Sequence, residues 1–106
     1  MKKYSVELTE LAEEDLKNAK EFYDLQADFL GNYFIDSILV DLDSLVFYGG
    51  IHKKVYGFYK MLAKRFPYAI YYDIENNNKL VIHAILDTRQ NPSKIENRLN
   101  KKSTSQ

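Results

Sequence analysis

Hydrophobic and polar residues alternate at the start of the chain and then change to a helical spacing. Within residues 3–8, Tyr4, Val6 and Leu8 fall on one side, which predicts a half-buried strand at the edge of a sheet. Thr9 follows and is itself followed by a run of acidic residues. A hydroxyl that caps free N–H groups and carboxylates near a helix dipole are typical of a helix N-terminus. A helix is therefore predicted to begin just after Thr9.

Two consecutive stretches have helical spacing. The apolar residues of the first are Ala12, Leu16, Ala19 and Tyr23. Those of the second are Phe34, Ile35, Ile38, Leu39, Leu42, Leu45 and Val46. A short join around Ala27 to Gly31 separates them, and Gly49-Gly50 ends the second. Residues 9–48 are therefore predicted to form an antiparallel helical hairpin whose apolar surface needs a cover.

The second half of the chain supplies that cover as three predicted strands. They are Val55 to Leu62, Phe66 to Ile74 and Lys79 to Leu86, and the asparagines at 76–78 form a turn cluster between the last two. Alternation predicts which side chains face the helices. These are Phe66, Tyr68, Ile70, Tyr72 and Ile74 in the middle strand and Leu80, Ile82, Ala84 and Leu86 in the last. The strands predict an antiparallel meander.

The end of the chain and its composition complete the predicted fold. Pro92 is expected to start a short helix through Leu99, and residues 100–106 are polar and expected to fray. With 106 residues, 45% hydrophobic and 28% charged, the chain fits one α+β domain over residues 1–106. It has no apolar run long enough for a membrane span, and its start lacks the apolar stretch of a secretory signal. A cytoplasmic location is therefore expected, with no membrane partner.

The net charge is zero, but the two halves of the chain carry opposite charge. Residues 1–50 hold four basic and eleven acidic side chains, and residues 51–106 hold eleven basic and four acidic ones. This gives −7 for the first half and +7 for the second. The split indicates either a polyanionic or acidic partner for the basic half or attraction between the halves within one fold.

Four cations are candidates for contact with a partner. Lys60, Lys64 and Arg65 lie in or beside the predicted meander and Arg89 follows it, so that they could converge at one end of the sheet. Such a cluster suits phosphates or acidic side chains. The alternative is that the lysines keep an edge strand soluble. Tyr71 is predicted to lie on the sheet face away from the helices, where it is a further candidate for partner contact.

The sequence offers little material for cofactor or metal chemistry. The absence of cysteine excludes disulfides and thiolate sites, and two histidines leave little for zinc, so no metal is expected. His83 is predicted mid-strand, on the face opposite the helices. It is interpreted either as a general base or as a partly exposed structural histidine that a partner covers. His52 is predicted in a loop.

Three motifs resemble those of the RelE/ParE toxins of bacterial toxin–antitoxin modules. They are AEEDL at residues 12–16, KRFPYAIYY at residues 64–72 and AILDTRQNP at residues 84–92. The order of strand, helical hairpin, meander and terminal helix is similar to that of this family as well. The resemblance implies a type II toxin that a cognate antitoxin neutralises, and it spans nearly the whole chain.

The family implies two alternative chemistries. RelE-like members cleave mRNA on the ribosome, whereas ParE-like members poison DNA gyrase without an active site of their own. The RNA-cleaving type uses an arginine in the central strand and a basic pair after the last one, but this chain has Ala69 and Thr88-Arg89. Asp87 could pair with Arg89 or repel RNA phosphate. The ParE-like interpretation is therefore preferred.

The alternatives that stay open differ in their targets. If the chain is a ribosome-dependent ribonuclease, the candidate catalytic residues are Lys60, Arg65, His83 and Arg89. If it is ParE-like, the cations and Tyr71 serve partner binding and no cofactor is needed. A degenerate relative that binds an antitoxin but harms nothing is a third hypothesis. The antitoxin is expected to cover the sheet and helices with a segment that folds on binding and brings acidic contacts.

Overall fold

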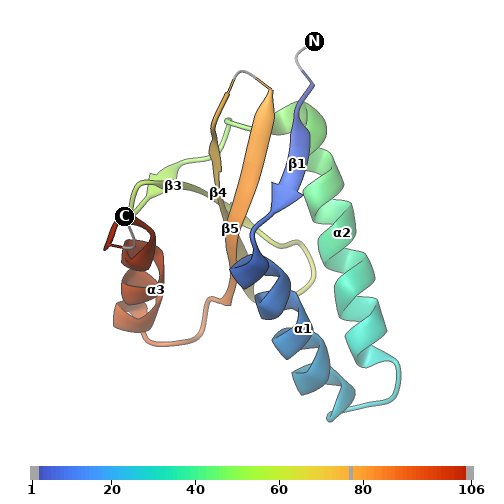
Figure 1. Cartoon of the computed structure of the whole chain (residues 1–106). Helices are drawn as coiled ribbons and strands as arrows, with labels where there is room; N and C mark the ends of the chain where they lie inside the picture. Colours follow the sequence, from blue (N-terminus) through green and yellow to red (C-terminus); the bar gives the residue numbers. More distant parts are fainter. Residues whose placement is uncertain (1–2, 77, 105–106) are drawn as a thin grey trace.

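A computed structural model describes residues 3–76 and 78–104 of the chain. Figure 1 shows its elements, which are β1 (Ser5–Leu8), α1 (Glu10–Asp24), α2 (Leu30–Tyr48), β2 (Lys54–Val55), β3 (Phe58–Leu62), β4 (Tyr68–Ile74), β5 (Lys79–Asp87) and α3 (Pro92–Thr104). The predicted α+β class and order of elements are confirmed. None of the helices in the described part of the chain has the length and apolar character of a membrane span.

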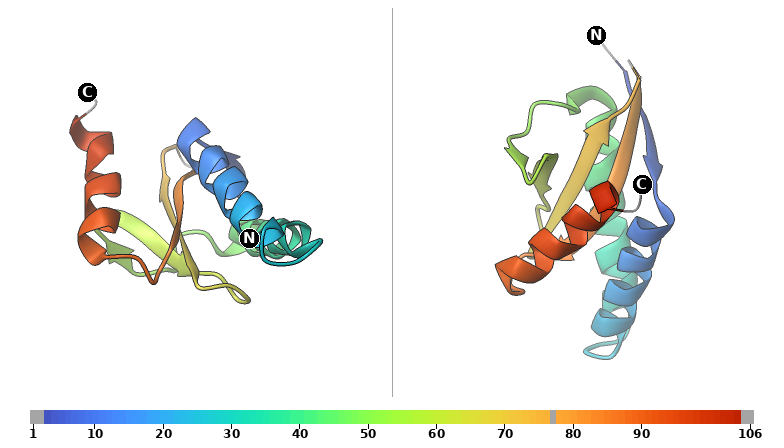
Figure 2. Two further views of the ribbon diagram at one scale, coloured as in Figure 1. Left: turned by 90° about the horizontal axis from the view of Figure 1, so that it is seen from below. Right: turned by 60° about the vertical axis from the view of Figure 1, so that its left-hand side comes forward.

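One mixed sheet lies between the helices. Its strand order is β1-β5-β4-β3-β2, with β1 parallel to β5 and every other pair antiparallel. The strand at the N-terminus is thus at an edge, as predicted. Helices α1 and α2 pack on one face, which we call the hairpin face, and α3 packs on the other, which we call the α3 face (Figure 2).

The helical hairpin forms as its sequence predicts. The Thr9 hydroxyl accepts a hydrogen bond from the Ala12 N–H at 3.1 Å, which caps α1. Ala12, Ala19 and Tyr23 are buried against α2 and the sheet. At the close approach of the two helices, a Cβ on Gly31 would lie 2.6 Å from the carbonyl oxygen of Lys20, so only glycine fits there.

The prediction of one strand from Val55 to Leu62 is wrong, because a turn interrupts this segment after Val55. Tyr56 and Gly57 both have positive φ, of 56° and 84°, and Val55 pairs with Phe58 across them. Two central residues with positive φ make the tight turn that joins antiparallel strands. The chain therefore forms two strands, β2 and β3, where one was predicted. The next strand also starts later than predicted, at Tyr68, because Pro67 precedes it.

A bulge in the β4–β5 pair changes which side chains of β5 face the helices. Tyr71 pairs with Ala84 and Tyr72 with Ile82, so His83 has no opposite residue in β4. Before the bulge, Leu80 and Ile82 face the hairpin as predicted. Beyond it, Ile85 faces the hairpin and Ala84 and Leu86 face α3, so the prediction for these two residues is wrong.

Helix α3 builds a second core on the far face of the sheet. It runs from Pro92 to Thr104, further than the predicted Leu99. The fraying expected of residues 100–106 stays a prediction, and residues 105–106 lie outside the described part of the chain. Ile95 and Leu99 pack on Phe58, Ala69, Tyr71, Ala84 and Leu86. Tyr71 is only 1% exposed in this cluster, so the expectation that it is available for partner contact is wrong.

Candidate functional site

Three of the four candidate cations lie at one end of the sheet. Lys64 and Arg65 are in the loop between β3 and β4, and Arg89 is in the loop after β5. The two loops are joined because the Thr88 N–H and hydroxyl donate to the Pro67 carbonyl oxygen at 2.8 and 3.0 Å. We call Lys64, Arg65 and Arg89 the basic end.

Lys60 does not join the basic end. It lies on β3 opposite Tyr71, on the α3 face, and is half-buried. The sequence predicts that all four cations could converge at one end of the sheet, because three lie in or beside the meander and Arg89 follows it. Strand alternation instead turns Lys60 to the opposite side of the sheet.

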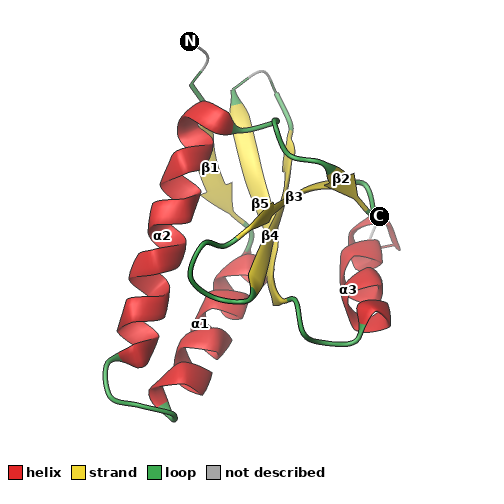
Figure 3. Cartoon of the chain, turned by 180° about the vertical axis from the view of Figure 1, so that it is seen from behind, coloured by secondary structure: helices red, strands yellow, loops and turns green. Residues whose placement is uncertain are grey.

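Helix α2 lines one side of the basic end (Figure 3). The Arg65 guanidinium donates to the Tyr33 hydroxyl at 3.2 Å, and the Lys64 N–H donates to a carboxylate oxygen of Asp41 at 3.2 Å. An open pocket of about 250 Å³ lies here. Its lining residues are Tyr33, Asp36, Ser37, Val40, Asp41, Lys64 and Arg65. The pocket combines an exposed apolar side chain, Val40, with charges of both signs.

Arg89 is paired within its own loop. Its guanidinium donates to both carboxylate oxygens of Asp87, at 3.0 and 2.8 Å, and its N–H donates to one of them at 2.8 Å. The hydrogen bonds from Arg89 lower the pKa of Asp87, so the pair is charged at neutral pH. Of the two roles considered for Asp87, pairing with Arg89 is therefore confirmed.

Two tyrosine hydroxyls border Arg89 on the hairpin face. Burial, reinforced by the nearby Tyr23 and Asp87, raises the pKa of Tyr68 to about 12. Burial also raises the pKa of Tyr23, and Arg89 partly offsets that rise. Both hydroxyls are therefore protonated at neutral pH and can take part in hydrogen bonds.

His83 is separated from the basic end. Its ring packs against Phe58 of the second core with centroids 5.2 Å apart, and its Nε2 lies 3.1 Å from a carboxylate oxygen of Asp73. The predicted position on the face away from the helical hairpin is thus confirmed. Arg65 and Arg89 instead border Tyr33 and Tyr23, which belong to the hairpin.

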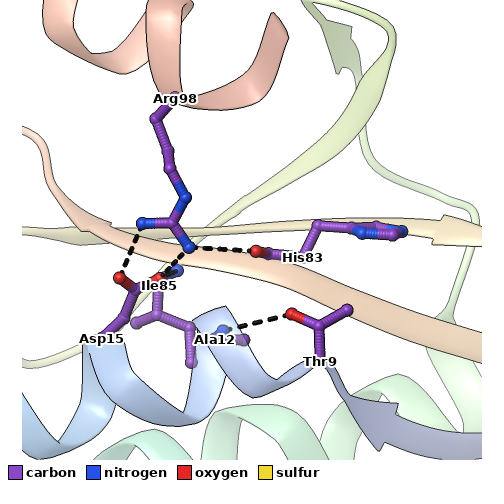
Figure 4. Close-up of polar contacts among 6 residues, drawn as sticks. All are labelled: Thr9, Ala12, Asp15, His83, Ile85 and Arg98. Carbon is purple, nitrogen blue, oxygen red and sulfur yellow. Dashed lines mark hydrogen bonds and ion pairs between the residues drawn. The ribbon is translucent and has the colours of Figure 1, made fainter. Parts of the chain in front are cut away.

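Sequence reasoning missed an ion pair that joins α1 to α3 (Figure 4). The Arg98 guanidinium donates to the two carboxylate oxygens of Asp15 at 2.7 and 2.8 Å, and also to the His83 carbonyl oxygen at 3.3 Å. Asp15 in turn accepts the Ile85 N–H at 2.9 Å. In the sequence, Asp15 belongs both to the acidic run after Thr9 and to the AEEDL motif, and neither predicts this pairing.

A comparison with family models decides the family. The model described as "ParE toxin of type II toxin-antitoxin system, parDE" matches residues 6–92, which is most of the chain. The chain belongs to the ParE toxin family. The match to the ParE toxin family begins in β1 and ends at the first residue of α3, so it includes the hairpin, the sheet and the basic end.

A solved structure shows the same fold. It is described as the chromosomal ParDE toxin–antitoxin system from P. aeruginosa, and it matches with a TM-score of 0.72 over 81% of this chain and 97% of that chain. The two sequences are 16% identical, so the likeness concerns the fold. No curated protein sequence matches. The ParE fold, with its long paired helices, is therefore established for this chain by both comparisons.

Proposed function

We propose that this ParE-family chain is the toxin of a type II toxin–antitoxin pair, that it inhibits DNA gyrase by protein contact, and that a cognate antitoxin neutralises it. The proposal rests first on the family match over residues 6–92. The observation that favours gyrase over RNA as the target is the separation of the groups that an RNA-cleaving site would need to hold together.

Cleavage of RNA needs a base beside the attacking hydroxyl and cations beside the phosphate. His83 lies on the α3 face in contact with Asp73, whereas Arg65 and Arg89 are at the basic end. Arg89 is occupied by Asp87, and Lys60 is on the α3 face. The tyrosine hydroxyls near Arg89 hold their protons. This arrangement is therefore better suited to binding a protein than to cleaving RNA.

The surface at the basic end suits an antitoxin segment with acidic and apolar side chains. Val40 is 63% exposed and Tyr33 is 48% exposed beside Lys64 and Arg65. An apolar side chain can cover Val40 while a carboxylate pairs with Arg65, the usual combination of apolar centre and charged rim. This position for the antitoxin is part of the proposal.

Purified chain is expected to inhibit supercoiling by gyrase and to leave ribosome-dependent mRNA cleavage at background. The measurement is a supercoiling assay run beside a translation assay with the same preparation, and growth arrest on expression is recorded in parallel. Addition of the cognate antitoxin, sought in the neighbouring reading frame, restores supercoiling. Cleavage of mRNA with unaffected gyrase would instead support the RelE-like alternative. Absence of every effect, together with tight antitoxin binding, would support the degenerate relative.

Replacing Arg65 by glutamate is expected to lower the affinity for the antitoxin at least tenfold. The change reverses the charge at the pocket and places a carboxylate near Asp36 and Asp41. Isothermal titration with the antitoxin measures the effect, and Lys94→Glu, an exposed charge reversal on α3, is the matched control. Equal losses in both variants would show that overall charge, and no local contact, governs binding.

A further inference from the structure

Three potential metal ligands meet on the α3 face, away from the basic end. They are Asp73 of β4, Glu75 directly after it and His83 of β5, and one ligand atom from each lies within 4.8 Å of the other two. His83 Nε2 lies 3.1 Å from an Asp73 carboxylate oxygen. Among the residues that the structure describes, these three form the group of histidine and carboxylate side chains that are close enough to share one metal ion.

The backbone brings these side chains together for identifiable reasons. Strand alternation places Asp73 on the α3 face, opposite Val81. The bulge then adds His83 between Val81 and Ala84 on that face. Bulges commonly re-aim a side chain beside a functional site. Figure 4 shows the imidazole pointing away from the Asp15–Arg98 pair, which holds only the His83 backbone.

Of the three potential ligands, His83 and Asp73 are largely buried by neighbouring side chains, whereas Glu75 is accessible to solvent. The side chains of His83 and Asp73 are 13% and 24% exposed, and the Phe58 ring packs on the imidazole. Glu75 is exposed, and its N–H donates to the Lys79 carbonyl oxygen at 2.8 Å, which keeps β4 and β5 paired at this point. The ammonium of Lys79 is paired with Glu7 at 3.6 Å. An ion could therefore reach the site from solvent and bind to side chains that the paired strands β4 and β5 hold in place.

We propose that Asp73, Glu75 and His83 bind one divalent first-row transition-metal ion, for which Zn²⁺ is the probe. An imidazole with two carboxylates suits zinc and its neighbours, whereas magnesium and calcium prefer oxygen ligands alone. Two ligands on one ion with bonds of about 2.1 Å lie roughly 3 to 4 Å apart. His83 and Asp73 already have this spacing, and rotation of the exposed Glu75 brings in the third ligand. Solvent completes the coordination.

Such an ion would link β4 to β5 close to the turn that joins them. It would neutralise two carboxylates on adjacent strands and hold the imidazole with one nitrogen on the metal. The same histidine that the sequence offered as a general base would then serve as a ligand. The site is distinct from the proposed partner surface, because the two lie on opposite faces of the sheet.

The test is a calorimetric titration of the full, chelator-treated chain with Zn²⁺, paired with melting temperatures. Wild type is expected to bind one ion and to melt at a higher temperature with Zn²⁺ present. His83→Gln is expected to lose at least tenfold in affinity and to show no zinc-dependent shift in melting temperature. His52→Gln is the matched control, since His52 is the other histidine and its Nδ1 contacts the Tyr72 hydroxyl.

Two further measurements test whether zinc binds at Asp73, Glu75 and His83. Glu75→Gln removes an exposed ligand without disturbing the core, and it should weaken zinc binding while leaving the metal-free melting temperature unchanged. The imidazole NMR signals of His83 should shift on zinc addition while those of His52 stay in place. Equal binding by His83→Gln, a response to Mg²⁺ as strong as to Zn²⁺, or no binding at about a hundredfold excess of Zn²⁺ would overturn the proposal.

Discussion

The variant Asp15→Ala is expected to lose about 3 kcal/mol of unfolding free energy. The side chains of Asp15 and Arg98 are 11% and 21% exposed, so the pair is largely shielded from solvent. Removal of one member of a buried pair leaves the other charge without compensation, which typically costs about 3–5 kcal/mol. The Ile85 N–H loses its acceptor in the same variant. Urea unfolding of the variant and wild type under the same conditions measures the loss.

The expected loss of stability is large because Asp15 and Arg98 cover the edge of β5 beyond the end of β1. Strand β1 ends at Leu8, and the last backbone bond on that edge is from the Thr9 N–H to the Ile82 carbonyl oxygen. Beyond it, the Asp15 carboxylate accepts a hydrogen bond from the Ile85 N–H, and the Arg98 guanidinium donates one to the His83 carbonyl oxygen. Side chains of two helices thus continue the hydrogen bonding of a strand that has ended, and the exposed edge is blunted.

Two comparisons separate this role from a general effect of charge. Glu14→Ala, the neighbouring exposed carboxylate, should change the unfolding free energy by less than about 0.5 kcal/mol. The double variant Asp15→Ala, Arg98→Met should lose less than the sum of the two single variants, because it leaves no unpaired guanidinium. If Asp15→Ala behaves like Glu14→Ala, the pair contributes nothing to the stability of the fold.

The elements that the sequence predicted well are those that local chemistry determines. The Thr9 cap, the apolar stripe of α1 and the alternation of β4 depend on residues a few positions apart. Tyr68, Ile70 and Tyr72 face the hairpin as predicted, since β4 keeps its alternation throughout. Period and capping alone were sufficient for these features.

The features that the sequence did not predict depend on distant pairing. The bulge at His83 exists only in the alignment of β5 with β4, and the Asp15–Arg98 pair joins residues 83 positions apart. The turn at Tyr56-Gly57 has a tyrosine at a position where asparagine or aspartate is usual. Tyr71 was expected at a surface because the terminal helix had not been assigned to that face of the sheet.

The opposite charges of the two halves serve in part to hold the fold together. Glu7 pairs with Lys79 and Asp15 with Arg98, and each pair joins the acidic half to the basic one. Lys64 and Arg65 lie beside Asp36 and Asp41 in the same way. Attraction within the fold therefore accounts for part of the charge split. Lys64 and Arg65 still border an open pocket, which is the surface proposed for a partner.

The aromatic cluster at the end of the hairpin gives the second large prediction. Phe34 is fully buried, and its ring lies 5.2 Å from Tyr23, 5.0 Å from Phe66 and 5.0 Å from Tyr68 between centroids. Phe66 directly follows Arg65 in the loop between β3 and β4. The cluster therefore joins α1, α2 and β4 and anchors the loop that carries Lys64 and Arg65.

Phe34→Ala is expected to cost about 3–5 kcal/mol of unfolding free energy, since it leaves a cavity among three rings. Phe34→Leu refills part of that cavity and should therefore cost less than Phe34→Ala. Phe22→Ala is the matched control, because Phe22 also contacts Tyr23, at 5.1 Å, but is 48% exposed. Urea unfolding gives all three values. Similar losses for Phe34→Ala and Phe22→Ala would contradict the central place of Phe34. Faster amide exchange in residues 63–66 of Phe34→Leu would confirm that the cluster positions the basic end.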